Sequence, residues 1–239
     1  QLPPIALEAK THKLTNMRKT IAKRLVESKT TIPHFTVTVA VAADRLLDTR
    51  ASINSVLESE GVKLSVNDFI VRATALALSR HPIVNASWNK DTIEQHGTVN
   101  MGIAVALPEE KGGGLVVPTL RDAQNMSLRE INSETRRLAK KAREAGLTVD
   151  EMSDGTFTIS NLGMFGVDHF EAIINPPQAA ILAVGAAVQQ PIVRDGQLTV
   201  GHAMELTGSF DHRVIDGATA AEFPATLRQL LENPAGMLV

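Results

Sequence analysis

The 239-residue sequence contains no cysteine. A cysteine nucleophile, a thiolate metal site and disulfide bonds are therefore excluded, and a reducing cytosol and an organelle matrix suit the chain equally well. No apolar run approaches the roughly 18 residues expected of a membrane-spanning helix, and the first residues do not resemble a signal peptide. The sequence therefore predicts no membrane partner.

An excess of charge of one sign is also missing. Lysine and arginine number 24, aspartate and glutamate 26, and the formal net charge is −2. This balance favours neither a nucleic-acid-binding surface nor a polybasic membrane patch. The histidines have no spacing typical of a metal site. Gly112-Gly113-Gly114 lacks the Lys-Ser/Thr of a phosphate loop, so we interpret it as a flexible loop. We therefore expect no nucleic acid and no metal.

Hydrophobic residues make up 44% of the chain, which is enough for one large domain with a substantial core. The opening Gln1-Leu2-Pro3-Pro4 is typical of the end of a linker. We expect residues 1–12 to be a linker remnant and residues 13–239 to form the domain.

Hydrophobic periodicity predicts both helices and strands. Ser65 with Asp68, and Ser127 with Glu130, predict capped starts for two of the helices. The expected helices cover 14–29, 44–59, 65–81, 127–145 and 218–232. The expected strands cover 35–41, 98–107, 115–120, 156–160, 179–189, 191–194 and 197–208. Asp195-Gly196 should form a hairpin turn, and Pro224 should kink the last helix or delay its start. The pattern leaves α/β and α+β classes open, with mainly antiparallel or mixed strand pairing.

The segment from Gly208 to Gly217 carries the clearest chemical signal. His212 is followed four residues later by Asp216 and then by Gly217, at the junction of an expected strand and helix. A histidine with the ordinary pKa of about 6.5 accepts and returns a proton near neutral pH. His-x-x-x-Asp-Gly alone is a weak motif, and the other interpretation is a turn histidine bonded to a nearby carboxylate.

Two further segments strengthen the functional interpretation. Residues 156–166 read Thr-Phe-Thr-Ile-Ser-Asn-Leu-Gly-Met-Phe-Gly, and residues 173–178 read Ile-Ile-Asn-Pro-Pro-Gln. In this order, and together with the His212 segment, they resemble the catalytic domain of dihydrolipoamide acyltransferases, the core-forming enzymes of 2-oxo acid dehydrogenase complexes. The resemblance extends from about Lys13 to Val239. The segment Asn-Leu-Gly-Met-Phe-Gly is most similar to the corresponding segment of the acetyltransferases of pyruvate dehydrogenase complexes.

The resemblance implies a two-layer sandwich with a mixed β-sheet, like chloramphenicol acetyltransferase. It also implies a homotrimer that assembles into a core of 24 or 60 subunits, and the sequence does not choose between these. The implied partners are lipoyl domains, the 2-oxo acid decarboxylase and dihydrolipoamide dehydrogenase. The expected location is a bacterial cytoplasm, with the mitochondrial matrix as the alternative.

The implied reaction moves an acetyl group between dihydrolipoamide and coenzyme A. Coenzyme A is a substrate, and the lipoyl group is carried on a separate domain. His212 is the candidate general base, because a thiol with a pKa of about 8.5 is only slightly ionised at pH 7. By resemblance, Ser160 is the hydroxyl donor to the oxyanion of the tetrahedral intermediate, and it comes from the neighbouring subunit. The other interpretation of Ser160 is a strand-end hydroxyl bonded to backbone. Asn161 is a donor of the right type without motif support.

Asp216 has two interpretations. It could hold the imidazole of His212 in one tautomer, as a triad acid does. It could also support the site by pairing with an arginine, for which Arg18, Arg24 and Arg213 are the candidates. Some acetyltransferases of the family have asparagine here, which disfavours an obligatory acid.

Other functions stay open at this stage. The alternatives are a succinyl- or branched-chain acyltransferase of the same family, a non-catalytic core protein, and a stand-alone acyltransferase or peptide-condensing domain. The condensing domains usually have a second histidine before the first, where this chain has Asp211.

The basic helix 17–24 is either a solvated face or a subunit contact. His34 is a candidate channel residue, His81 a helix terminus, and His12, His96, His169 and His202 are expected to be exposed or in loops. The apolar Met237-Leu238-Val239 either docks into a partner or folds on its own subunit.

Overall fold

The computed structural model describes residues 7–108, 110, 113–194 and 196–238. Its centre is a mixed sheet with the strand order β1-β11-β9-β8-β4-β7, in which β10 also pairs with β11. β8 runs parallel to β9 and to β4, and the other neighbours are antiparallel. The strands of this sheet are β1 (His34–Ala42), β4 (Met101–Ile103), β7 (Thr119–Leu120), β8 (Phe157–Asn161), β9 (Ala180–Val184), β10 (Val188–Arg194) and β11 (Gln197–Asp211).

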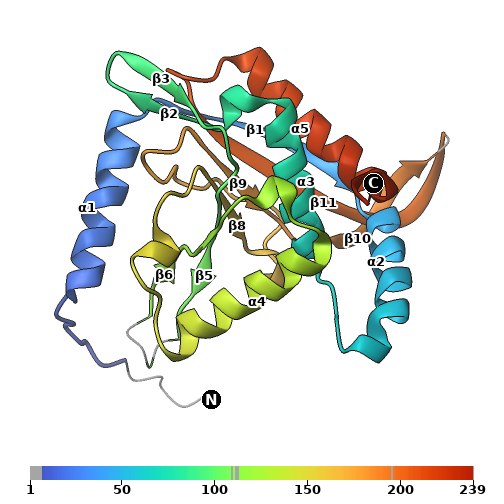
Figure 1. Cartoon of the computed structure of the whole chain (residues 1–239), viewed down its shortest axis with the longest axis horizontal. Helices are drawn as coiled ribbons and strands as arrows, with labels where there is room; N and C mark the ends of the chain where they lie inside the picture. The colour runs from blue at the N-terminus through green and yellow to red at the C-terminus, as the bar shows by residue number, and fades with distance from the viewer. Residues whose placement is uncertain (1–6, 109, 111–112, 195, 239) are drawn as a thin grey trace, which may run out of the picture.

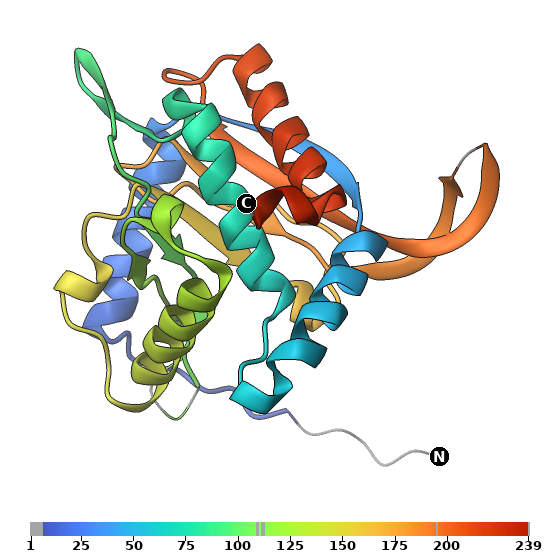
Figure 2. The same ribbon diagram turned by 45° about the vertical axis from the view of Figure 1, so that its right-hand side comes forward.

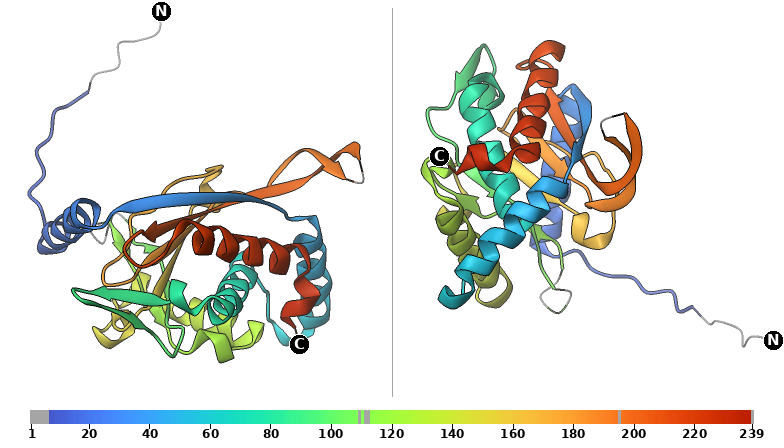
Figure 3. Two further views of the ribbon diagram at one scale, coloured as in Figure 1. Left: turned by 90° about the horizontal axis from the view of Figure 1, so that it is seen from above. Right: turned by 90° about the vertical axis from the view of Figure 1, so that its right-hand side faces the viewer.

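Helices cover one face of this sheet, as the views from above and from the side show (Figure 3). They are α2 (Asp44–Leu57), α3 (Val66–Arg80), α4 (Leu128–Glu144) and α5 (Gly217–Glu232). Phe223 of α5 meets the rings of Phe157 and Phe210 at centroid distances of 5.8 and 6.3 Å, so large apolar side chains join the two layers. The predicted two-layer sandwich with a mixed sheet is confirmed.

The first helix, α1 (Asn16–Thr31), stands beside the body of the molecule rather than on the helical layer (Figure 1). Met17, Leu25 and Val26 are 46%, 41% and 62% exposed, so several apolar side chains of this helix stay largely in solvent within one subunit. Ser28 Oγ donates a 2.6 Å hydrogen bond to the carbonyl of Ile174 and ties the helix to the chain after β8.

Two capping boxes predicted from the sequence are present. Ser65 accepts from the N–H of Asp68 at the start of α3, and the Asp68 carboxylate accepts in return from the N–H of Ser65. Ser127 and Glu130 do the same for α4. Each box satisfies two otherwise unpaired donors of the first turn, which fixes where these helices begin.

Several boundaries differ from the prediction. The hairpin of β2 (Ala86–Asn89) and β3 (Thr92–Gln95) was not predicted. The expected strand 179–189 divides at Gly185, where a Cβ would lie 1.8 Å from the carbonyl oxygen of Asp168. The expected strands 98–107 and 115–120 also divide: β4 pairs with β7, and a separate pair joins β5 (Val105–Ala106) to β6 (Leu115–Val116). A delayed start of α5 is wrong, because the helix begins at Gly217 and includes Pro224.

β10 and β11 form the predicted hairpin, which projects from the body (Figure 2). Arg194 is paired with Gln197, and Gly196 has a φ of 76°. Asp195, part of the predicted turn, lies outside the described residues, as do residues 1–6 of the expected linker, Gly112 of the expected glycine loop and Val239. No helix within the described ranges has both the length and the hydropathy to cross a membrane.

Candidate active site

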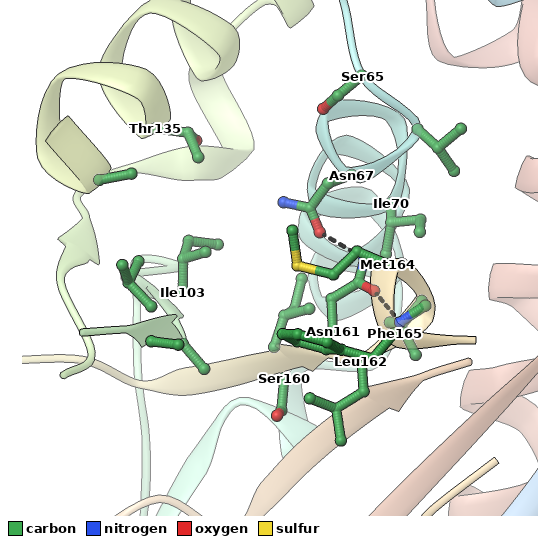
Figure 4. Close-up of a pocket in the computed structure, with 18 of the residues that line it drawn as sticks. Ser65, Asn67, Ile70, Ile103, Thr135, Ser160, Asn161, Leu162, Met164 and Phe165 are labelled. Atoms are coloured by element: carbon green, nitrogen blue, oxygen red, sulfur yellow. Dashed lines mark hydrogen bonds between the residues drawn. The ribbon is translucent and has the colours of Figure 1, made fainter. Parts of the chain in front are cut away.

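Ser160 lies near the end of β8 and lines a cavity of about 450 Å³. The start of α3, one side of α4, the β5–β6 pair and the loop after β8 form much of the rest of the wall (Figure 4), and β4, β9 and β11 contribute further residues. The side chain of Ser160 is half-buried. Met164 and Phe165, in the loop after β8, are 80% and 67% exposed beside this cavity. The wall is therefore mainly apolar, with few polar groups.

Asn161, next to Ser160, is fully engaged in holding its surroundings. Its Nδ2 donates to Oδ1 of Asn67 at 3.0 Å, and its Oδ1 accepts from the N–H of Gly163 at 2.9 Å. A Cβ at Gly163 would lie 2.8 Å from the carbonyl oxygen of Gly185, so the chain passes too closely there for any other residue. Asn161 thus ties the end of β8 to α3 and to the following turn.

His212 follows β11 directly and is exposed within one subunit. Its backbone N–H donates to the carbonyl of Pro33 at 3.1 Å, and its ring stacks on Phe35 with centroids 4.4 Å apart. Among the described residues, no hydrogen bond from its imidazole is found. The backbone is therefore fixed while both ring nitrogens remain open to a substrate.

Asp216 caps the N-terminus of α5. Its Oδ1 accepts a 2.8 Å hydrogen bond from the N–H of Thr219. That bond, followed by the Thr219 hydroxyl and with a contribution from the charge of nearby His212, holds the pKa of Asp216 below its ordinary value. The Asp216 carboxylate thus stays ionised. It caps α5 and interacts with His212 through its charge.

Arg213 was one of three candidate partners of Asp216, and this interpretation is wrong. Its guanidinium pairs with Asp211, with Nη2 donating to Oδ2 at 2.7 Å and Nε to Oδ1 at 3.0 Å. It also lies 5.0 Å from the centre of the Trp88 ring. Arg24 instead donates to the carbonyl of Pro176 at 3.1 Å. The buried Asp211 thus pairs with Arg213, two residues away, and this ion pair shapes the turn that carries His212.

Most of the remaining histidines have structural partners. His34 bridges β1 and a loop, because Nδ1 donates to the carbonyl of Ile32 at 2.9 Å and Nε2 accepts from the N–H of Ile174 at 3.1 Å. His81 bonds Thr226, and His96 bonds Ser87. His202 was expected to be exposed or in a loop, but it lies in β11 and its Nδ1 is 3.0 Å from Asp44 Oδ1. Within the described part of the chain, no cluster of three or more acidic or histidine side chains could hold a metal.

The sheet register shows how far Ser160 lies from His212. Ser160 is opposite Ala183 of β9, and Ala183 is opposite Thr207 of β11. His212 comes five residues after Thr207. The two backbones are separated by two strand spacings of about 4.8 Å across the sheet and by five residues of about 3.3 Å along the strand. Combined at right angles, these distances place them roughly 19 Å apart. They lie toward opposite ends of the strands of one sheet, so a single subunit does not bring them together.

The fold defines a class: a chloramphenicol acetyltransferase-like sandwich. A solved chloramphenicol acetyltransferase is 17% identical, has a TM-score of 0.52 and covers 91% of this chain and 94% of its own, which shows likeness of fold alone. The sequence narrows the class further. The model of the 2-oxoacid dehydrogenases acyltransferase (catalytic domain) family matches residues 6–239, and the chain belongs to that family.

Curated relatives and solved structures support this family assignment. The dihydrolipoyllysine-residue acetyltransferase component of the Rickettsia felis pyruvate dehydrogenase complex is 47% identical over 225 residues, covering 94% of this chain and 54% of that protein. The chain therefore spans about half the length of the curated relatives it matches. The Azotobacter vinelandii dihydrolipoamide acetyltransferase structure is 34% identical, with a TM-score of 0.90 and full coverage of both chains. The cubic core of a pyruvate dehydrogenase multienzyme complex is 33% identical, also with a TM-score of 0.90 and full coverage.

Proposed function

We propose that this chain transfers an acetyl group between dihydrolipoamide and coenzyme A, as a dihydrolipoyllysine-residue acetyltransferase. The observation that carries the proposal is family membership over nearly the whole chain, together with the open imidazole of His212. The Azotobacter vinelandii structure belongs to a study of one serine, one histidine and one asparagine in that enzyme's catalytic mechanism. Their spacing in sequence equals the spacing from Ser160 to His212 and from His212 to Asp216.

His212 acts as the general base in this proposal. It takes the proton of the coenzyme A thiol as the sulfur attacks the carbonyl carbon of acetyl-dihydrolipoamide. A tetrahedral intermediate forms with a negative oxygen. When it collapses, the bond to the lipoyl sulfur breaks and the imidazolium returns the proton to that sulfur. The ionised Asp216 stabilises the imidazolium through its charge while its carboxylate caps α5.

Ser160 donates a hydrogen bond to the negative oxygen of the intermediate. An oxyanion donor must lie about 2.7–3.1 Å from that oxygen, and the base within about 2.6–3.2 Å of the thiol. Both groups must therefore serve one small reacting centre. Because roughly 19 Å separate them within a subunit, as estimated from strand geometry, we propose that His212 of one subunit works with Ser160 of its neighbour.

A shared site requires an oligomer, and we propose a homotrimer as its smallest form. The exposed apolar side chains of α1, with Met17, Leu25 and Val26, offer a surface for the neighbouring subunit. The structural relative that forms a cubic core supports assembly of trimers into a larger core, for which 24 and 60 subunits remain the two predictions. Lipoyl domains, the decarboxylase and dihydrolipoamide dehydrogenase would be the partners, and a bacterial cytoplasm remains the predicted location, with the mitochondrial matrix as the alternative.

The proposed activity is tested by measuring acyl transfer with acetyl-, succinyl- and branched acyl-coenzyme A and free dihydrolipoamide. We expect acetyl transfer to have the highest kcat/KM. A preference for succinyl or branched acyl groups would assign the chain to another branch of the family. Absence of transfer from every donor, with a correctly assembled protein, would favour the non-catalytic core protein.

The C-terminal end provides a separate prediction about assembly. Met237 is buried on its own subunit and belongs to the main core, whereas Leu238 is 51% exposed beside Ile53, Leu57 and Leu128. We propose that Leu238 anchors the contact between trimers. Leu238→Glu should leave active trimers that no longer build the large core, seen as a loss of mass in light scattering.

A matched control separates this contact from folding. Val149→Glu places the same charge at an exposed apolar residue elsewhere, which is 79% exposed. It should leave the core intact. A full-size core formed by Leu238→Glu would assign the end of the chain to its own subunit alone.

A further inference from the structure

The Asn67–Asn161 hydrogen bond lies at the wall of the Ser160 cavity, and the mechanism above does not use it. Asn67 is in the first turn of α3 and lines the cavity together with Asn161. In Figure 4 the oxygen of Asn67 faces Asn161, and its nitrogen points toward the space between α3, α4 and the strand that carries Ile103. No hydrogen bond from this nitrogen to any described residue is found.

The orientation of both amides follows from one backbone group. The N–H of Gly163 can only donate, so the side-chain atom of Asn161 that faces it must be the oxygen. The NH₂ of Asn161 is then turned to Asn67, and it can only donate. The atom of Asn67 that faces it must accept and is therefore Oδ1. The NH₂ of Asn67 is left pointing into the cavity as a donor of fixed direction.

The rest of the cavity is suited to an extended, mostly apolar ligand. Its wall is largely aliphatic and aromatic, and Arg143 is the charged residue among the described residues that line it. In such cavities a few well-placed polar groups fix the orientation of the ligand. Both thiol substrates of the proposed reaction carry their sulfur on a flexible arm that contains an amide carbonyl, an acceptor that matches the NH₂ of Asn67.

We propose that Asn67 is a substrate-binding residue whose NH₂ donates to an amide carbonyl of the thiol arm in this cavity, and that Asn161 is the positioning residue that keeps this NH₂ turned inward. The inference rests on the proposed acetyl transfer and assigns a binding contact within it. The arm belongs either to coenzyme A or to dihydrolipoamide, and the two are distinguished by titrating each substrate separately.

Removing the donor should weaken binding more than catalysis. Asn67→Ala should raise the KM of one thiol substrate by about 3- to 10-fold, the usual size for one uncharged hydrogen bond. The kcat and the KM of the other thiol should remain unchanged. Calorimetric titration of the assembled protein with each thiol should show the same loss of affinity. Asn67→Asp keeps the acceptor for Asn161 but turns a carboxylate oxygen inward, so it should weaken the same substrate further.

Asn161→Asp tests the orientation itself. One carboxylate oxygen still accepts from Gly163, but the other now faces Oδ1 of Asn67. The amide of Asn67 should turn over to donate to it and point its oxygen into the cavity. The donor is thus lost although Asn67 is unchanged, and the KM of the same thiol should rise. On the Asn67→Ala background, Asn161→Asp should add no further rise, because the group it turns is already gone.

Asn89→Asp, at an exposed residue of the β2–β3 hairpin, is the charge-matched control and should behave as the wild type. Unchanged KM values for both thiols in Asn67→Ala and Asn161→Asp would overturn the proposal. An equal rise for both thiols, or a fall in kcat with normal KM, would overturn it as well, since the pair would then support the wall or Ser160 itself. If the wild-type protein transfers no acetyl group, the proposed function fails first, and the calorimetric titrations still decide whether Asn67 binds either thiol.

Discussion

Replacement of His212 by alanine is expected to lower the kcat of acetyl transfer by roughly 10²- to 10⁴-fold, the usual contribution of a general base. Without the imidazole, the attacking thiol must lose its proton to water, and the departing lipoyl sulfur has no donor in place. The fold should not suffer, because the side chain is exposed and its described ring contact is with Phe35. The measurements are kcat with both substrates saturating and particle mass by light scattering.

A second histidine provides the control for this result. The side chain of His169 is 64% exposed and lies 3.3 Å from Glu205, away from the β11–α5 turn. His169→Ala should keep wild-type kcat and mass. If His212→Ala retained activity within a few-fold of the wild type, another base would have to be found. If it lost its assembly together with its activity, the loss of kcat would say nothing about proton transfer.

The chemistry of the site was more predictable than its geometry. Motifs in the sequence indicated His212, Ser160 and Asp216 as the residues to test. Their separation across the sheet depends on the antiparallel pairing of β11 with β9, which local patterns do not specify. The cap formed by Asp216 had a readable signal, since aspartate is a preferred residue just before a helix. The Asn67–Asn161 bond joins residues far apart in sequence and had no local signal.

The fold shows the same division between local and tertiary causes. The starts of α3 and α4 were predicted because a serine and an acidic residue three positions later close a cap without help from the rest of the chain. The β2–β3 hairpin was missed because its turn has no glycine and uses Lys90 with a φ of 48° instead. The run 179–189 looked like one strand, and only the close approach of the Asp168 carbonyl explains its break at Gly185.

Ser160→Ala is expected to lower kcat by roughly 10²- to 10³-fold if its hydroxyl is the sole oxyanion donor. The Michaelis constants should hardly change, because the hydrogen bond strengthens only as negative charge develops on the carbonyl oxygen. Ser133→Ala, on the exposed side of α4, is the matched control and should retain full activity. A large rise in Michaelis constant with normal kcat would instead make Ser160 a substrate-binding residue.

The decisive form of this prediction mixes the two inactive chains. In a trimer of shared sites, the Ser160→Ala chain still supplies an intact His212, and the His212→Ala chain still supplies an intact Ser160. A mixed trimer then contains one site in which both residues are present, so co-expression should restore part of the lost kcat, whereas pooling separately assembled mutants should restore none. Recovery requires that the subunits exchange before assembly, which differently tagged chains and tandem purification establish. Purified mixed trimers that remain inactive would show that each site takes both residues from one subunit. The roughly 19 Å between them in this fold, estimated from strand geometry, would then have to close by a movement within the subunit.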